Sequence, residues 1–338
     1  MSGPQTLLLL LPLHARPEDA IEPLEGWRYL TAWDLSPWAV IPLLLSLGIY
    51  LWGVHMLHRR GDRWPLLRTV SWIMAHLLLL VSLCGFLGVY DNVLFWVHMV
   101  QHMLITMIAG VHIAQAAPVT LALRTLPRRP RAWLLAVLHS TIAKILLFPP
   151  LTTLCMIGYP FALYMTPLYE FTMRHDWAHN IMHIWMVYIG TAFFIPILGT
   201  DPLPNKLPYP LRLLLVLLSM PGHAFIGVTI MGAQRLVAEE WYLAFDRDWG
   251  ISPMRDQSWA GAILWATGDL TMFTMLTALV INWYKDSQKE ARRVDRALDR
   301  AEEAEAHARV LSQPVPDGSN DLAGSLPEAH VKDDPDER

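Results

Sequence analysis

Apolar segments about as long as a helix that crosses a bilayer recur along this chain, and they constrain its fold more than any other feature. A helix rises 1.5 Å per residue, so roughly 20 apolar residues span the hydrocarbon of a membrane. Hydrophobic residues make up 54% of the sequence, which argues against an ordinary soluble domain. We expect an all-α integral membrane protein, a bundle of seven transmembrane helices near residues 35–57, 66–89, 93–115, 151–168, 180–199, 211–232 and 259–283.

The charges between these segments predict their orientation, because Lys and Arg gather in the cytoplasmic loops of membrane proteins. The turn "YDN" and the loops "EFTMRHDWAHN" and "AEEWYLAFDRDWGISPMRDQ" hold more acids than bases. We therefore expect the N-terminus outside and the C-terminus in the cytoplasm. The loops after the first and third segments are strongly basic, with Arg59, Arg60, Arg63, Arg68, Arg124, Arg128, Arg129 and Arg131.

The seven-helix domain is expected to cover residues 35–283, after an extracytoplasmic N-terminal segment at residues 1–34. Residues 284–338 are rich in charge and end in a stretch rich in Pro, Asp, Gly and Ser. We expect them to form a charged cytoplasmic tail that is first helical and then disordered.

Residues 132–148 resemble a further span but follow an arginine cluster and contain His139 and Lys144. This composition favours an amphipathic helix in the inner membrane interface. Cys84 and Cys155 fall near opposite faces of the expected membrane, so we expect them to stay unpaired.

Histidines occur at a similar depth on three of the expected helices. His98 and His102 lie four residues apart, as do His179 and His183, so each pair shares one face of its helix. His223 on a third helix is expected at a depth like that of His102. All five fall in the outer half of the expected membrane.

Two interpretations of these histidines are open. A lone histidine inside a membrane is most often a core residue with a hydrogen-bond partner, but two pairs and a fifth residue at one depth favour a metal site. Imidazole and thioether ligands together favour copper, Cu(I) in particular, although any single methionine also packs well in a core. The neighbouring methionines are Met99, Met103 and Met182, with Met107 and Met220 close by in the sequence.

Two carboxylates lie on the last expected span. Asp256 falls at its outer mouth, where it could accept the second N–H of a ligating histidine. Asp269 falls near the middle of the membrane, where it could orient a ligand or carry protons.

A series of motifs resembles one known family. The motifs "HMVQHML", "APVTLALRTLP", "MTPLYE", "IMHIWMVYIG", "LGTDPLP", "MPGHAFIGVTIM" and "DQSWAGAILWATGDL" follow one another in this order. Over about residues 35 to 285 the chain resembles the CtaG family of bacterial cytochrome c oxidase assembly factors. The family motifs fall on His98, Met99, His102 and Met103, on His179, Met182 and His183, on His223, and on Asp256 and Gln257.

The resemblance implies a multi-pass protein of the bacterial plasma membrane that helps to build a haem-copper oxidase. It implies that copper is delivered by ligand exchange and that the protein is not an enzyme. The implied partners are cytochrome c oxidase subunits and other copper chaperones. Membrane lipid would surround the protein, and no nucleic acid is expected as a partner. Two alternatives stay open: a haem b protein that carries electrons through the membrane with two axial histidines, and a metal-free assembly scaffold.

Overall fold

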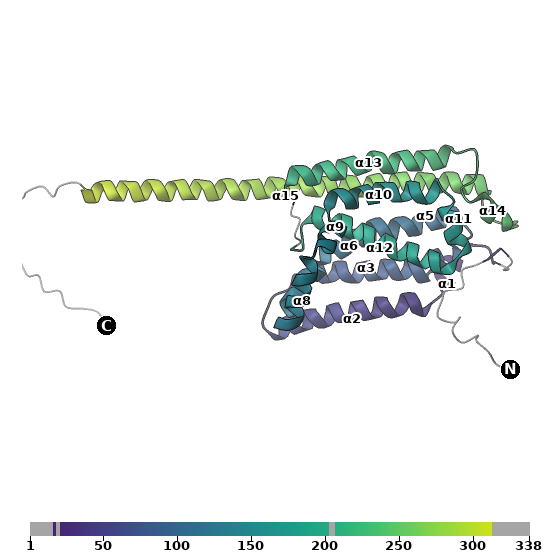
Figure 1. Cartoon of the computed structure of the whole chain (residues 1–338), viewed down its shortest axis with the longest axis horizontal. Helices are drawn as coiled ribbons and strands as arrows, with labels where there is room; N and C mark the ends of the chain where they lie inside the picture. The colour runs from purple at the N-terminus through teal and green to yellow at the C-terminus, as the bar shows by residue number, and fades with distance from the viewer. Residues whose placement is uncertain (1–15, 18–20, 203–206, 313–338) are drawn as a thin grey trace, which may run out of the picture. The chain divides into compact units, whose positions relative to one another are not determined.

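Long apolar helices form this protein, whose computed structural model describes residues 16–17, 21–202 and 207–312. The chain divides into two compact units, Met1–Trp283 and Tyr284–Arg338. Figure 1 shows the long helices of the first unit running side by side. The helices are α1 (Arg28–Thr31), α2 (Pro37–Arg59), α3 (Leu66–Cys84), α4 (Phe86–Tyr90), α5 (Phe95–Met103), a π-helical turn (Leu104–Ala109), α6 (Gly110–Ala116), α7 (Pro118–Thr125), α8 (Arg128–Leu138), α9 (Thr141–Leu146), α10 (Pro149–Tyr164), α11 (Leu168–Arg174), α12 (Asp176–Leu198), α13 (Tyr209–Gly232), α14 (Glu239–Ala244) and α15 (Pro253–Ser312).

Six stretches of the described chain are long and apolar enough to cross a membrane, which supports an all-helical membrane protein. A seventh crossing is available if α10 and α11, which meet at an angle of 72°, count as one broken span. The six stretches are Pro37–Arg59, Leu66–Tyr90, Phe95–Thr125, Asp176–Leu198, Tyr209–Gly232 and the apolar part of Pro253–Arg309.

The expected helix at residues 151–168 ends early, at Tyr164. Pro167 restricts the backbone of the residue before it, which disfavours an uninterrupted helix. The Thr166 hydroxyl donates to the Ala162 carbonyl at 2.6 Å and accepts the Leu168 N–H at 3.2 Å. The last turn of α10 is thereby joined to the first turn of α11.

The expected interfacial helix at residues 132–148 is two short helices, α8 and α9. The first ends at Leu138, and the Ser140 hydroxyl accepts the Ala143 N–H to begin the second. An N-cap serine of this kind favours a new helix start over continuation. Trp133 and Ile142 are both exposed on this pair.

The third apolar stretch contains a π-helical turn directly after α5. There α12 approaches so closely that a side chain on Gly190 would overlap the Thr106 carbonyl, and a Cβ on Gly110 would lie 2.9 Å from the Gly190 carbonyl carbon. Wide turns of this type often lie at functional sites. The contact holds α12 against the helix that carries His98.

The last helix is longer than expected, because it begins at Pro253 and continues to Ser312. In the second unit its described residues are exposed, and Lys289 pairs with Asp286 at 2.8 Å. The disorder expected at the end of the tail lies outside the described residues. Cys84 and Cys155 are both free.

Candidate metal centre

Four buried imidazoles from two helices of the first unit lie close together: His98 and His102 on α5 and His179 and His183 on α12. We call them the four-histidine cluster. Their exposed fractions lie between 0% and 6%. The ring centroids of His98 and His102 are 4.3 Å apart, those of His179 and His183 are 4.6 Å apart, and those of His98 and His179 are 6.0 Å apart. The two HxxxH pairs of the sequence therefore lie next to each other, with His98 of α5 beside His179 of α12.

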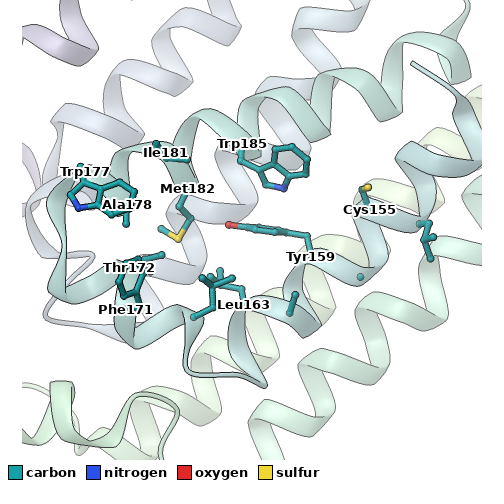
Figure 2. Close-up of a pocket in the computed structure, with 14 residues that line it drawn as sticks. Cys155, Tyr159, Leu163, Phe171, Thr172, Trp177, Ala178, Ile181, Met182 and Trp185 are labelled. Carbon is teal, nitrogen blue, oxygen red and sulfur yellow. The ribbon is translucent and has the colours of Figure 1, made fainter. Parts of the chain in front are cut away.

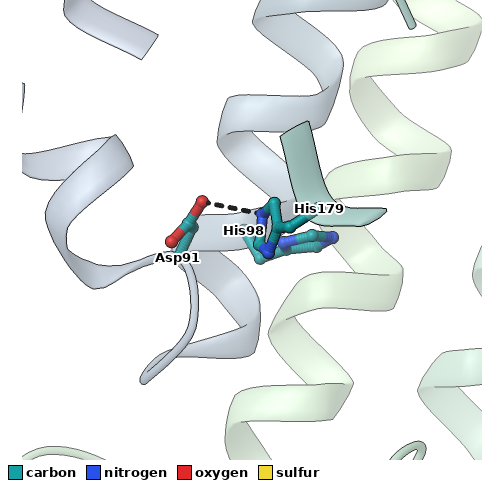
Figure 3. Close-up of side chains that lie close together, drawn as sticks. All are labelled: Asp91, His98 and His179. Carbon is teal, nitrogen blue, oxygen red and sulfur yellow. Dashed lines mark ion pairs between the residues drawn. The ribbon is translucent and has the colours of Figure 1, made fainter. Parts of the chain in front are cut away.

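A carboxylate from the short turn between α4 and α5 lies beside this cluster. Asp91 follows α4 directly, and its Oδ2 lies 3.2 Å from His179 Nε2 (Figure 3). The same oxygen lies 3.8 Å from His183 Nε2. Ligand atoms of Asp91, His98 and His179 all lie within 4.8 Å of one another. The sequence signal for Asp91 is its position: it is a single acid between two apolar segments, seven residues before His98.

Several buried polar atoms of this cluster have no hydrogen-bond partner in the described chain. They include both ring nitrogens of His98, Nε2 of His102 and both carboxylate oxygens of Asp91. A buried polar group without a partner costs roughly 1–3 kcal/mol, and a charged one costs more. Imidazole nitrogens and a carboxylate oxygen within 4.8 Å of one another are a donor set that fits a transition-metal ion.

Tyr164 on α10 contacts one ring nitrogen of His102 and the neighbouring Met99. Its hydroxyl lies 2.9 Å from His102 Nδ1 and 3.9 Å from the sulfur of Met99. The short contact holds the imidazole through Nδ1, so Nε2 is the nitrogen that has no hydrogen-bond partner in the described chain.

Gln101 and Trp38 hold His183 in a similar way. The Gln101 amide donates to the Ser82 carbonyl at 2.9 Å, so its oxygen faces His183 Nε2 at 3.0 Å and accepts from it. Trp38 stacks on the imidazole with centroids 6.5 Å apart and planes 8° from parallel. Such contacts orient histidines in metal sites.

The methionines of the expected ligand set lie in three different surroundings. The sulfur of Met99 accepts the Tyr164 hydroxyl, and Met103 is a buried member of the apolar core. Met182 lines an apolar cavity of about 660 Å³ between α10, α11 and α12. Figure 2 shows the side chains of Met182 and Tyr159 among the residues that line this cavity.

His223 is buried on α13 but has other neighbours. Its Nδ1 donates to the Ser219 carbonyl at 2.9 Å, and its ring packs on Gly268 of α15, 3.2 Å from the position of an added Cβ. Asp269, next along α15, interacts electrostatically with it, and Oδ1 of Asp269 is buried without a hydrogen-bond partner. No contact described for His223 joins it to the four-histidine cluster.

Asp256 and Gln257 hold loops at the same end of the bundle. The Asp256 carboxylate accepts the N–H of Phe95 at 3.0 Å and of Trp96 at 2.7 Å, and it lies 3.6 Å from Arg247. It therefore stabilises the start of α5, where helix N–H groups have no partner within the helix. The Gln257 oxygen accepts the Val237 N–H at 2.6 Å. The Asp256 carboxylate thus binds the start of α5 and Arg247, and no contact described for it reaches a histidine of the cluster.

Residues of α14 cover the cluster on the side of Asp91. Trp241 donates its indole N–H to the Asn92 carbonyl at 2.9 Å, and Tyr242 shares a hydrogen bond of 2.6 Å with Tyr169. The ring of Tyr169 lies 4.9 Å from that of His98. Burial raises the pKa of Tyr242 well above its ordinary value, so this hydroxyl stays protonated.

Comparisons with known proteins agree with this arrangement of motifs. A family model described as cytochrome c oxidase caa3 assembly factor matches residues 48–286. Uncharacterised proteins of Mycobacterium bovis and Mycobacterium tuberculosis are each 33% identical over 297 residues, which cover 85% of this chain and 45% of the relative. An uncharacterised protein of Mycobacterium leprae is 32% identical over 280 residues, or 80% of this chain and 42% of the relative. This chain thus spans less than half the length of these curated relatives, and no solved structure matches it.

Proposed function

This chain belongs to the cytochrome c oxidase caa3 assembly factor family, and from that membership we propose that it binds copper in the four-histidine cluster and delivers it to a subunit of the oxidase. The observation that carries the proposal is the set of buried imidazole nitrogens without partners, His98 Nδ1, His98 Nε2 and His102 Nε2. Buried imidazoles that lie this close together bind first-row transition ions well, and copper most tightly among the divalent ones.

Copper would be transferred by exchange of ligands. A carrier must release its ion to a site that binds it better, so histidines that a partner can replace one at a time suit this role. Met99 and Met103 lie on the same helix as His98 and His102, and thioether sulfur favours Cu(I) if the Tyr164 hydroxyl releases Met99.

Two observations favour an ion over the other candidates. A haem held by two of these histidines needs space for a flat macrocycle, whereas the second imidazole of each pair lies 4.3 or 4.6 Å from the first. A metal-free scaffold would not need donors without partners at its centre, because buried polar groups are normally satisfied. Copurification with oxidase subunits distinguishes a metal-free scaffold from a copper carrier.

We further propose that α10 and α11 together make a seventh crossing, with the N-terminus outside and the C-terminus in the cytoplasm. The basic loops after α2 and α7 would then face inward, together with α8 and α9 in the inner interface. Asp91 would face the outer side, where copper is delivered.

An anaerobic competition titration with Cu(I) tests the proposal. The variant replaces His98, His102, His179 and His183 with alanine. Its matched control replaces four exposed histidines, His55, His58, His139 and His307. We expect the wild type and the control to bind about one ion per chain and the cluster variant none.

Copurification with oxidase subunits completes the test. If the wild type binds no copper and the cluster variant still copurifies with the oxidase, the protein is a scaffold and the copper proposal is wrong. Circular dichroism of each variant shows whether it is folded.

A further inference from the structure

Three carboxylates are fully buried in the described chain, and two of them have an evident structural partner. Asp201 accepts the N–H of Thr120 at 2.7 Å and its hydroxyl at 2.6 Å, at the start of α7. Asp256 accepts two N–H groups at the start of α5. The third is Asp91, which is only 1% exposed and whose two oxygens accept no hydrogen bond from the residues that the structure describes.

No Lys or Arg of the described chain forms an ion pair with Asp91. Arg28 binds the Tyr90 hydroxyl at 3.2 Å and pairs with Glu22 at 3.1 Å, and Arg247 pairs with Asp256. The ion-pair partners of Asp91 are the ring nitrogens of His179 and His183. A buried carboxylate without a cation is strongly unfavourable, so either a protonated imidazole or a metal ion beside Asp91 would stabilise it.

The donors beside Asp91 are hard or intermediate in character. His98 and His179 bring a nitrogen within 4.8 Å of a carboxylate oxygen and of each other. Ligand atoms about 2.0 Å from one ion lie roughly 2.8 Å apart in a square-planar site and roughly 3.3 Å apart in a tetrahedral one, so side-chain rotations would close this set around an ion. The nearest methionine on α5, Met99, has its sulfur bound by the Tyr164 hydroxyl, and Met182 lines the cavity between α10 and α12.

We propose that Asp91 is a metal ligand and that, together with His98 and His179, it makes this site bind copper as Cu(II). This inference rests on the proposed function, that the four-histidine cluster binds copper. A set of imidazole and carboxylate ligands suits divalent ions, and Cu(II) binds such sites more tightly than Zn(II). The carboxylate also neutralises one of the two charges of the ion in a buried site.

The test measures Cu(II) and Cu(I) affinity separately for the wild type and for Asp91→Asn. We expect the variant to bind Cu(II) at least about tenfold more weakly, while its Cu(I) affinity changes less than about threefold. Asp201→Asn is the matched control, because it removes another buried carboxylate, and its Cu(II) affinity should stay at the wild-type value. If Asp91→Asn loses affinity for Cu(I) and Cu(II) equally, or keeps its Cu(II) affinity, the inference is overturned.

A second measurement needs no substitution. Wild-type protein is grown with ¹³C-carboxyl aspartate and loaded with Cu(II). Electron–nuclear double resonance should then detect a carboxylate carbon coupled to the copper. A spectrum without this coupling would overturn the role of Asp91. A wild type that binds Cu(I) but not Cu(II) contradicts this inference and leaves the proposed function standing. A wild type that binds neither contradicts both.

Discussion

Gly190 of α12 lies against the carbonyl oxygen of Thr106, inside the π-helical turn that follows α5. The contact leaves no room for a side chain, so it sets the distance between the two helices that carry the four-histidine cluster. It lies two helical turns from His183 on α12 and one turn from His102 on α5.

Gly190→Ala is therefore expected to lower the stability of the protein by about 1–3 kcal/mol, because the added methyl group must push two backbones apart. Thermal unfolding in detergent measures the loss. Gly48→Ala is the matched control, since a Cβ at Gly48 of α2 would meet nothing within 4 Å. Equal melting temperatures for the two variants would show that the close contact is absent.

Tyr164→Phe should weaken copper binding by about 10–100-fold with the fold intact, because it removes the group that orients His102. Tyr159→Phe removes a hydroxyl that has no described hydrogen-bond partner, so its copper affinity should stay at the wild-type value. A competition titration of both variants makes the comparison. Equal affinities would argue against an orienting role for Tyr164.

Asp256→Asn is expected to destabilise the protein by roughly 1–3 kcal/mol without changing how many copper ions it binds. The substitution weakens a charged cap at the start of α5 and leaves Arg247 without its carboxylate. Thermal unfolding and copper stoichiometry are measured on the same samples. A loss of bound copper at unchanged stability would place Asp256 at the metal instead.

Acid should release copper from the loaded protein. Protons compete with the ion for imidazole nitrogen, so the affinity falls as the pH is lowered and is largest where the histidines are neutral. Equilibrium dialysis at a series of pH values measures the retained copper. A pH-independent affinity would indicate that the histidines are not the ligands.

Much of the fold could be predicted from sequence because membrane helices are long and continuously apolar. The broken span at Tyr164 and the division of α8 from α9 depended on Pro167 and Ser140, single residues whose effect an apolar window averages away. The π-helical turn leaves no periodic trace in a uniformly apolar segment.

The site was harder to predict than the fold. Spacing of four residues predicts that His98 and His102 share one face of a helix, as do His179 and His183. The structure shows both pairs, with their rings 4.3 and 4.6 Å apart, and places His98 beside His179. Depth along a helix says nothing about rotation around it, so the depth expected for His223 did not indicate that its ring packs on α15. Asp91 lies in a short turn, where no periodicity indicates whether a carboxylate points to water or inward.

The central claim is that copper sits among the imidazoles of α5 and α12, and X-ray absorption at the copper edge of the loaded wild-type protein tests it most directly. We expect nitrogen or oxygen scatterers at about 2.0 Å with the outer-shell pattern of imidazole, and loss of the bound copper in the four-alanine variant. A spectrum dominated by sulfur at about 2.3 Å, or the same imidazole spectrum from the four-alanine variant, would contradict the account.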